Sequence, residues 1–231
     1  MKRPSILLYF SEGVRSIVER FSSAKFRKNY VPEKVGDGRP VLVIPGFLGN
    51  DKNTKPLRDF LERLNYTAYP WELQRNMGKA EDLEKLMAKV IAINEKHQEK
   101  ITIIGWSLGG VYARDLAKQR PDLIRQVITM GAPFGGIMNP NNAVWLFRLL
   151  RGKATKIWDE KWLQKIHEPA PVLTTAIYSK TDGVIYWKDC LEKAEDALHH
   201  NVEANGSHLG MPHNKAILKI IANELAEDKK S

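Results

Sequence analysis

The segment GWSLGG at residues 105–110 contains the residue types that nucleophilic catalysis needs. It follows the apolar run Ile101–Ile104 and precedes a helical pattern, so we expect Ser107 on a sharp turn between a strand and a helix. The flanking glycines leave room for such a turn, and the following helix points its free N–H groups and dipole at the serine. The pattern therefore predicts that Ser107 is a nucleophile.

A serine hydroxyl is a weak nucleophile, so Ser107 needs a base and an acid that orients the base. After a turn of this kind, the chain order is serine, acid, histidine. Asp182 follows the apolar run Val172–Tyr178, where a side chain is held at the carboxyl edge of a parallel sheet. An aspartate before Gly183 is also typical of an ordinary turn. Because a nucleophile is predicted upstream, we assign Asp182 as the acid.

The predicted base is His208, in the glycine-bounded segment NGSHLG at 205–210. It follows the last expected strand, as the chain order requires. His213 lies on the same loop and is its rival, with a supporting or helix-start role as the alternative. The four other histidines lie in less suitable places, namely His97, His167, His199 and His200.

The attack of a serine on a carbonyl creates an oxyanion that needs preorganised N–H donors. One expected donor is the backbone amide of Leu108, directly after the nucleophile. The other is expected in the segment PGFLG at 45–49, which follows the first central strand. We predict the backbone amide of Phe47, because Gly46 lets the chain turn that N–H toward the site.

The elements that must position these residues alternate between strand and helix. Strands are expected at 41–44, 66–71, 101–104, 124–130, 172–178 and about 200–204. Helices are expected near 57–64, 83–91, 107–119 and 217–225. Short apolar strands separated by helices indicate an α/β fold, with a mostly parallel sheet of about six strands covered by helices on both faces.

Residues 137–168 interrupt this alternation with aromatic and basic residues where a single helix would suffice. We interpret them as a helical lid insertion whose aromatic residues form a groove for an acyl chain; packing of the insertion on the domain is the alternative. The predicted substrate-binding residues are Trp106, Phe134, Trp145, Phe147 and Trp158.

Residues 4–21 have apolar side chains at helical spacing, with charged residues on the other side. This pattern predicts an amphipathic helix that docks on the core or, alternatively, lies in a membrane interface. We divide the chain into residues 1–40, which hold this helix and a connector, and a main domain at 41–231.

Composition narrows the function classes. The 231 residues carry a net charge of +9, most of it in 1–40 and 137–168. This distribution fits a basic surface or peripheral contact with an anionic membrane. A nucleic-acid partner is not expected, because no recognition module is present. The single cysteine and the lack of a long apolar run indicate a cytoplasmic protein, free or peripheral at a membrane.

Taken together and in order, these motifs resemble the lipase and esterase branch of the α/β-hydrolase superfamily, nearest to compact bacterial lipase-like members. The matching segments are PGFLG at 45–49, GWSLGG at 105–110, GAPFGG at 131–136, TDGV at 181–184 and GSH at 206–208. Lipases often have His-Gly where this chain has Pro45-Gly46, and His where it has Phe134. These departures leave the predicted triad intact but bear on substrate choice.

The resemblance implies a carboxylic-ester hydrolase that forms an acyl-enzyme, without a metal or cofactor. The implied partner is a small-molecule ester or a lipid. An acyltransferase with the same triad is the main alternative, and a non-catalytic binding protein on the same fold is another. The sequence leaves acyl chain length, head group and oligomeric state open.

Overall fold

The computed structural model describes residues 3–137, 139, 142, 160–194 and 196–227. Its centre is one sheet in the order β2-β1-β3-β4-β5-β6, in which every neighbouring pair is parallel. The strands are β1 (Pro40–Ile44), β2 (Thr67–Tyr69), β3 (Ile101–Trp106), β4 (Ile124–Met130), β5 (Leu173–Tyr178) and β6 (His199–Glu203). The expected parallel sheet of about six strands is confirmed.

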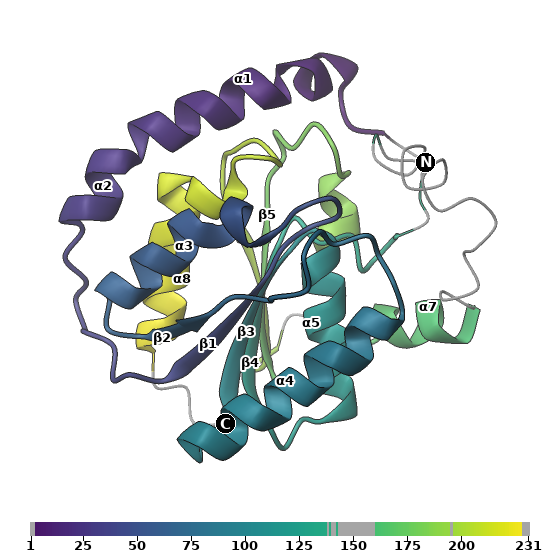
Figure 1. The fold of residues 1–231 in the computed structure, drawn as a ribbon. Coiled ribbons are helices and arrows are strands. Elements are labelled where there is room, and N and C mark those ends of the chain that lie inside the picture. Colours follow the sequence, from purple (N-terminus) through teal and green to yellow (C-terminus); the bar gives the residue numbers. More distant parts are fainter. Residues whose placement is uncertain (1–2, 138, 140–141, 143–159, 195, 228–231) are drawn as a thin grey trace.

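Helices cover both faces of this sheet, as predicted (Figure 1). They are α1 (Ile6–Ser22), α2 (Ala24–Asn29), α3 (Asp51–Arg63), α4 (Glu81–His97), α5 (Leu108–Gln119), α7 (Glu160–His167) and α8 (Lys215–Ala226), with 3-10 turns η2 (Trp187–Cys190) and η3 (Met211–His213). Helices α4 and α5 pack on one face, while α3 and α8 pack on the other.

Strand β1 illustrates why the sequence adopts this arrangement. All five of its residues are buried, because both faces of the sheet are covered. Leu42 and Ile44 pack into the core under α4 and α5. Val41 and Val43 point the other way, into the core under α3 and α8. An uninterrupted apolar run is therefore required here, rather than the alternating pattern of a half-exposed strand.

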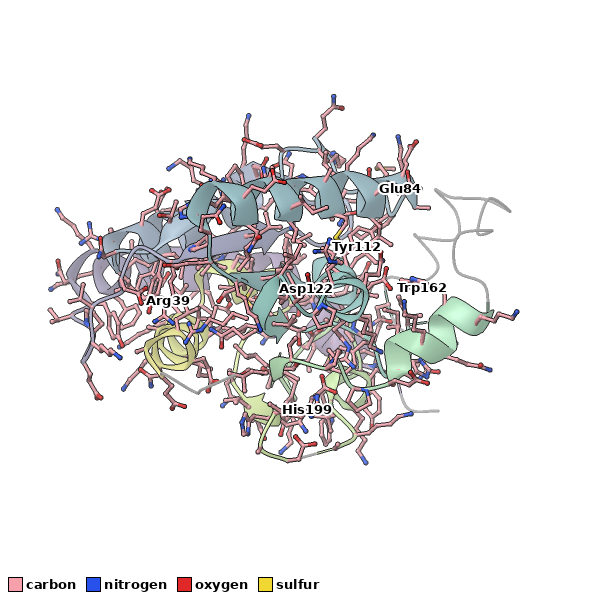
Figure 2. The ribbon with its side chains drawn as sticks, turned by 90° about the horizontal axis from the view of Figure 1, so that it is seen from below. Arg39, Glu84, Tyr112, Asp122, Trp162 and His199 are labelled. Atoms are coloured by element: carbon pink, nitrogen blue, oxygen red, sulfur yellow. The ribbon has the colours of Figure 1, made fainter. Side chains whose placement is uncertain are left out.

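Residues 137, 139, 142 and 160–168 of the predicted insertion are described, and they include the helix α7, which packs beside α5. Ile166 is fully buried, and Trp162 packs against the core on the α5 side (Figure 2). This helix therefore contacts the flank of the domain. The lid itself stays a prediction, since Trp145, Phe147 and Trp158 lie outside the described residues.

The N-terminal helix α1 lies across the carboxyl edge of the sheet, above the loops that leave the strands (Figure 1). The predicted helix is present, but its polar side faces the domain and its apolar side faces outward. Within the described ranges, no helix is both long and apolar enough to cross a membrane. The division of the chain at residue 40 stays a prediction.

Candidate active site

Ser107 stands between two regular elements, since β3 ends at Trp106 and α5 begins at Leu108. Its φ and ψ are 54° and −121°. A backbone conformation of this kind costs a residue with a Cβ about 1–3 kcal/mol. The Ser107 amide donates to the carbonyl of Met130 at the end of β4 (2.8 Å), which holds the turn in place. The turn brings Ser107 to the wall of a pocket, where a nucleophile must be.

Glycines around Ser107 let the strand and the helix approach each other closely. A Cβ on Gly105 would lie 2.4 Å from the carbonyl oxygen of Gly109, and one on Gly109 would lie 2.4 Å from that of Ile44. Neither position can therefore hold a side chain without moving backbone atoms. The close approach places the first turn of α5, with its N–H groups and positive dipole end, directly behind Ser107.

The predicted acid and base meet in a buried hydrogen bond. The imidazole Nδ1 of His208 lies 2.6 Å from Oδ2 of Asp182, and both side chains are buried. The other oxygen, Oδ1, accepts from the backbone amides of Val184 (2.7 Å) and Ile185 (2.8 Å). The carboxylate is thus fixed on both oxygens. A proton held on Nδ1 leaves Nε2 of His208 as the acceptor that a general base needs.

Electrostatics at His208 favour the charged imidazolium. Burial opposes the charge, but the Asp182 carboxylate and its hydrogen bond, together with the charge of Glu12, outweigh that cost and raise the pKa of His208. The indole Nε1 of Trp106 donates to the main-chain carbonyl of His208 (3.0 Å), which anchors the histidine loop to β3. A base with a raised pKa accepts a proton more readily.

The expected oxyanion loop at 45–49 passes directly over the nucleophile. A Cβ on Gly46 would lie 3.0 Å from the Cβ of Ser107, so the two backbones are nearly in contact. Phe47 lines the same pocket as Ser107, and Leu108 is the first residue of α5. The two backbone amides chosen from the sequence therefore belong to the segments on either side of the serine.

Asn76 holds this loop in place, and sequence reasoning missed it. Its side-chain amide donates to the carbonyl of Pro45 (2.8 Å). Its main-chain carbonyl accepts from Leu48 (2.7 Å), and its main-chain amide donates to Gly49 (2.8 Å). Asn76 is fully buried, so these bonds satisfy polar groups that water cannot reach.

A pocket of about 440 Å³ contains Ser107 and His208 in its wall. Most of the remaining wall is apolar or aromatic, which suits the hydrocarbon part of a substrate. These residues include Tyr9, Phe10, Phe47, Leu48, Trp106 and Val184. The predicted substrate contact of Trp106 is compatible with this position, and two of the aromatic residues come from α1.

Glu12 on α1 joins the acid loop to the histidine loop. Its Oε1 accepts from the backbone amides of Gly183 (2.8 Å) and His208 (3.0 Å), and its Oε2 accepts from Leu209 (2.9 Å). The side chain is 2% exposed. A buried carboxylate with three N–H donors is a strong, directional link. Glu12 thus fixes the backbone on both sides of the Asp182–His208 pair.

Further contacts repeat this link along the same face of α1. The backbone amide of Ser207 donates to Glu19 (2.8 Å), and the Arg15 guanidinium donates to the carbonyl of Thr181 (2.7 Å). The sequence signal was the recurrence of Glu12, Arg15 and Glu19 on one side of a helix. That signal identified a polar face without showing that the face is an internal surface.

Phe134 does not line the pocket that holds Ser107, so its position does not support the predicted substrate contact. It is buried against the guanidinium of Arg114, whose Cζ lies 3.9 Å from the ring centroid. Arg114 is itself buried and forms an ion pair with Glu192. The ring therefore shields a buried charge.

The other histidines next to the sheet have separate partners. His213 contacts the carbonyl of Ser16 on α1 through Nε2 (3.0 Å). His199 is the first residue of β6, so it lies at the amino end of that strand, away from the carboxyl edge that holds Ser107 (Figure 2). Its Nδ1 lies 2.8 Å from Oδ1 of Asp196. The geometry therefore favours His208 as the partner of Asp182. No group of three or more His, Cys, Asp or Glu side chains in the described part of the chain could hold a metal ion.

Comparison with known proteins identifies the fold. A family model described as alpha/beta hydrolase fold matches residues 22–169. The chain is similar to a monoacylglycerol lipase of Paleococcus ferrophilus (14% identity, TM-score 0.55, 80% of this chain and 96% of that one). It is also similar to a mature lipase of Bacillus licheniformis (14% identity, TM-score 0.62, 85% of this chain and 96% of that one). A third similar structure is an extracellular alpha/beta-hydrolase of a Paenibacillus species (16% identity, TM-score 0.53, 83% of this chain and 100% of that one).

Proposed function

The chain belongs to the alpha/beta hydrolase fold family, and we propose that it hydrolyses carboxylic esters through an acyl-enzyme on Ser107. The observation that carries this proposal is the meeting of three segments at one pocket. Ser107 and His208 share its wall, and the imidazole of His208 is held by Asp182 at 2.6 Å. The lipases of similar fold support an ester as the substrate.

Acylation begins when Ser107 Oγ attacks the ester carbonyl while His208 Nε2 removes its proton. Asp182 holds the imidazole tautomer and stabilises the imidazolium. The resulting oxyanion is bound by the backbone amides of Phe47 and Leu108. His208 then gives the proton to the leaving alkoxide, and the alcohol departs from the acyl-enzyme.

Deacylation repeats these steps with water as the nucleophile. His208 removes a proton from water as the water attacks the acyl carbonyl, and then returns the proton to Ser107 Oγ. The carboxylic acid leaves and the free enzyme is restored. The apolar pocket wall fits an acyl chain better than a charged substrate, which favours esters of fatty or aromatic acids.

The test is hydrolysis of p-nitrophenyl esters, from short to long acyl chains, by the wild type and Ser107→Ala. The variant should lose turnover by about 10³-fold or more, because the nucleophile is gone. Ser22→Ala, an exposed serine on α1, is the matched control and should keep full activity. Near-normal turnover in Ser107→Ala would refute the proposal. A burst of one equivalent without turnover in the wild type would instead indicate an acyltransferase.

A further inference from the structure

The outward side of α1 carries a continuous apolar surface. Of the large apolar side chains that are exposed in the described residues, most belong to this one helix, with exposures from 56% to 78%. They are Ile6, Leu7, Phe10, Val14, Ile17, Val18 and Phe21. We call these seven residues the α1 apolar face. Soluble domains rarely leave such a surface uncovered, so it marks a contact with another apolar phase or molecule.

The helix cannot turn this face toward its own domain. Its opposite side is held by Glu12, which accepts three backbone amides, and by Glu19, which accepts from Ser207. Rotation of α1 would break these bonds and leave buried amides unpaired. The polar contacts therefore fix the apolar face outward.

The charges on the same segment are sorted in a matching way. Residues 3–29 contain two acidic residues, Glu12 and Glu19, and both side chains face the domain. The exposed charged residues of that segment are all basic, namely Arg3, Arg20, Lys25 and Lys28. The outer surface of α1 and α2 thus combines apolar and cationic groups without an exposed carboxylate, as helices that bind anionic lipid surfaces do.

A basic groove of about 460 Å³ continues this surface between α1–α2 and α3. Asp59 is the only acidic residue in its lining, and it pairs with Lys55. Burial and the neighbouring charge of Arg20 lower the pKa of Arg27, as expected of crowded cations. The basic residues of the lining are Arg20, Arg27, Lys28, Lys52, Lys55 and Arg63.

The α1 apolar face also reaches the pocket of Ser107. Phe10 belongs to this face and to the pocket wall, and Tyr9 and Gly13 line the pocket beside it. A molecule leaving an apolar phase at α1 would therefore meet the pocket without crossing open water.

We propose that α1 docks on an anionic phospholipid surface, with the α1 apolar face among the acyl chains and the basic residues at the head groups. A second copy of the chain would cover the apolar face but would bring the two sets of cations together, which is unfavourable. Docking does not depend on the chemistry at Ser107. Delivery of lipid esters from that surface into the pocket rests on the proposed function.

The test is sedimentation of the full chain carrying Ser107→Ala with vesicles of phosphatidylcholine alone or mixed with phosphatidylglycerol. This protein should bind the anionic vesicles more tightly. A triple variant Leu7→Gln, Val14→Gln, Val18→Gln, at exposed sites outside the pocket, should lose at least about tenfold in affinity. The matched control, Val31→Gln, Val35→Gln, Leu198→Gln, changes exposed apolar residues elsewhere and should bind like the parent.

Two results would overturn the proposal. One is equal vesicle binding by the α1 triple variant and its control. The other is dimer formation by the Ser107→Ala protein that the α1 triple variant abolishes and the control variant does not. In that case a second copy of the chain would cover the α1 apolar face. In an active background, the α1 triple variant should hydrolyse a short soluble ester normally. If the wild type lacks esterase activity while vesicle binding persists, the proposed function fails and docking stands.

Discussion

Glu12 provides the sharpest test of how the site is held, and the change is Glu12→Gln. The carboxylate accepts backbone amides from Gly183, His208 and Leu209 and is nearly fully buried. Its charge is also one of the causes that raise the pKa of His208. Glutamine preserves the shape of the side chain but removes the charge and replaces one acceptor oxygen with a donor. Geometry and electrostatics at His208 should therefore change together.

The cost follows from the three hydrogen bonds. One backbone amide loses its acceptor, and the other two exchange a charged acceptor for a neutral one, a loss of about 3 kcal/mol in total. A domain stable by about 5–15 kcal/mol survives this loss. Thermal unfolding should therefore occur about 6–12 °C lower in a chain of this length. Looser histidine and acid loops should lower kcat/KM by about tenfold to a hundredfold.

The decisive assay is the pH dependence of kcat/KM with a short, soluble ester. His208 must be neutral to act as base, so activity rises as pH increases through its pKa. The Glu12 charge raises that pKa, and its removal lowers it. The acidic limb of the Glu12→Gln profile should therefore move toward lower pH, even though the overall rate falls.

Glu19→Gln is the matched control for this assay. Glu19 also accepts a backbone amide of the histidine loop, at Ser207, but its charge is not among the causes of the pKa shift of His208. This variant should lose stability without moving the acidic limb. If the limb stays in place in Glu12→Gln as well, or moves equally in both variants, the electrostatic role of Glu12 is refuted.

Three further changes test the rest of the site. Asp182→Asn should lower kcat by about 10³–10⁴-fold while the fold is kept, as measured by turnover and circular dichroism. Gly105→Ala should destabilise the protein by several degrees in thermal unfolding, because its Cβ would lie 2.4 Å from the Gly109 carbonyl oxygen. Asn76→Ala should lower kcat more than it raises KM in steady-state kinetics, since the loosened loop carries the proposed oxyanion donor, Phe47; an effect on KM alone would contradict this.

The strands and the triad candidates could be predicted because their signals are local. Continuous apolar runs mark strands covered on both faces, and Ser107, Asp182 and His208 each follow a strand at the carboxyl edge. Strand β2 is shorter than expected because the chain meets Pro70, which cannot donate to the ladder.

The contacts that the sequence did not reveal depend on distant partners. The partners of Glu12 are backbone amides, a group that almost every residue has, so no residue type pointed to the contact. Amphipathicity showed that residues 4–21 have two faces, but it did not show which face meets the domain. The packing of Phe134 on Arg114 could not be foreseen either, because the ion-pair partner of Arg114 is Glu192, which is far away in the sequence.

The two faces of α1 connect lipid binding to catalytic geometry. The inward face holds the backbone at His208 through Glu12, and the outward face holds the surface proposed to enter lipid. A lipid surface that prefers α1 in contact with its own domain must stabilise that contact, because linkage is reciprocal. The contact between α1 and the domain in turn fixes the Asp182–His208 pair. If lipid binds α1 more tightly when the helix contacts the domain, vesicles should raise kcat/KM even for a soluble ester, and Glu12→Gln should weaken that effect while vesicle binding by the apolar face remains.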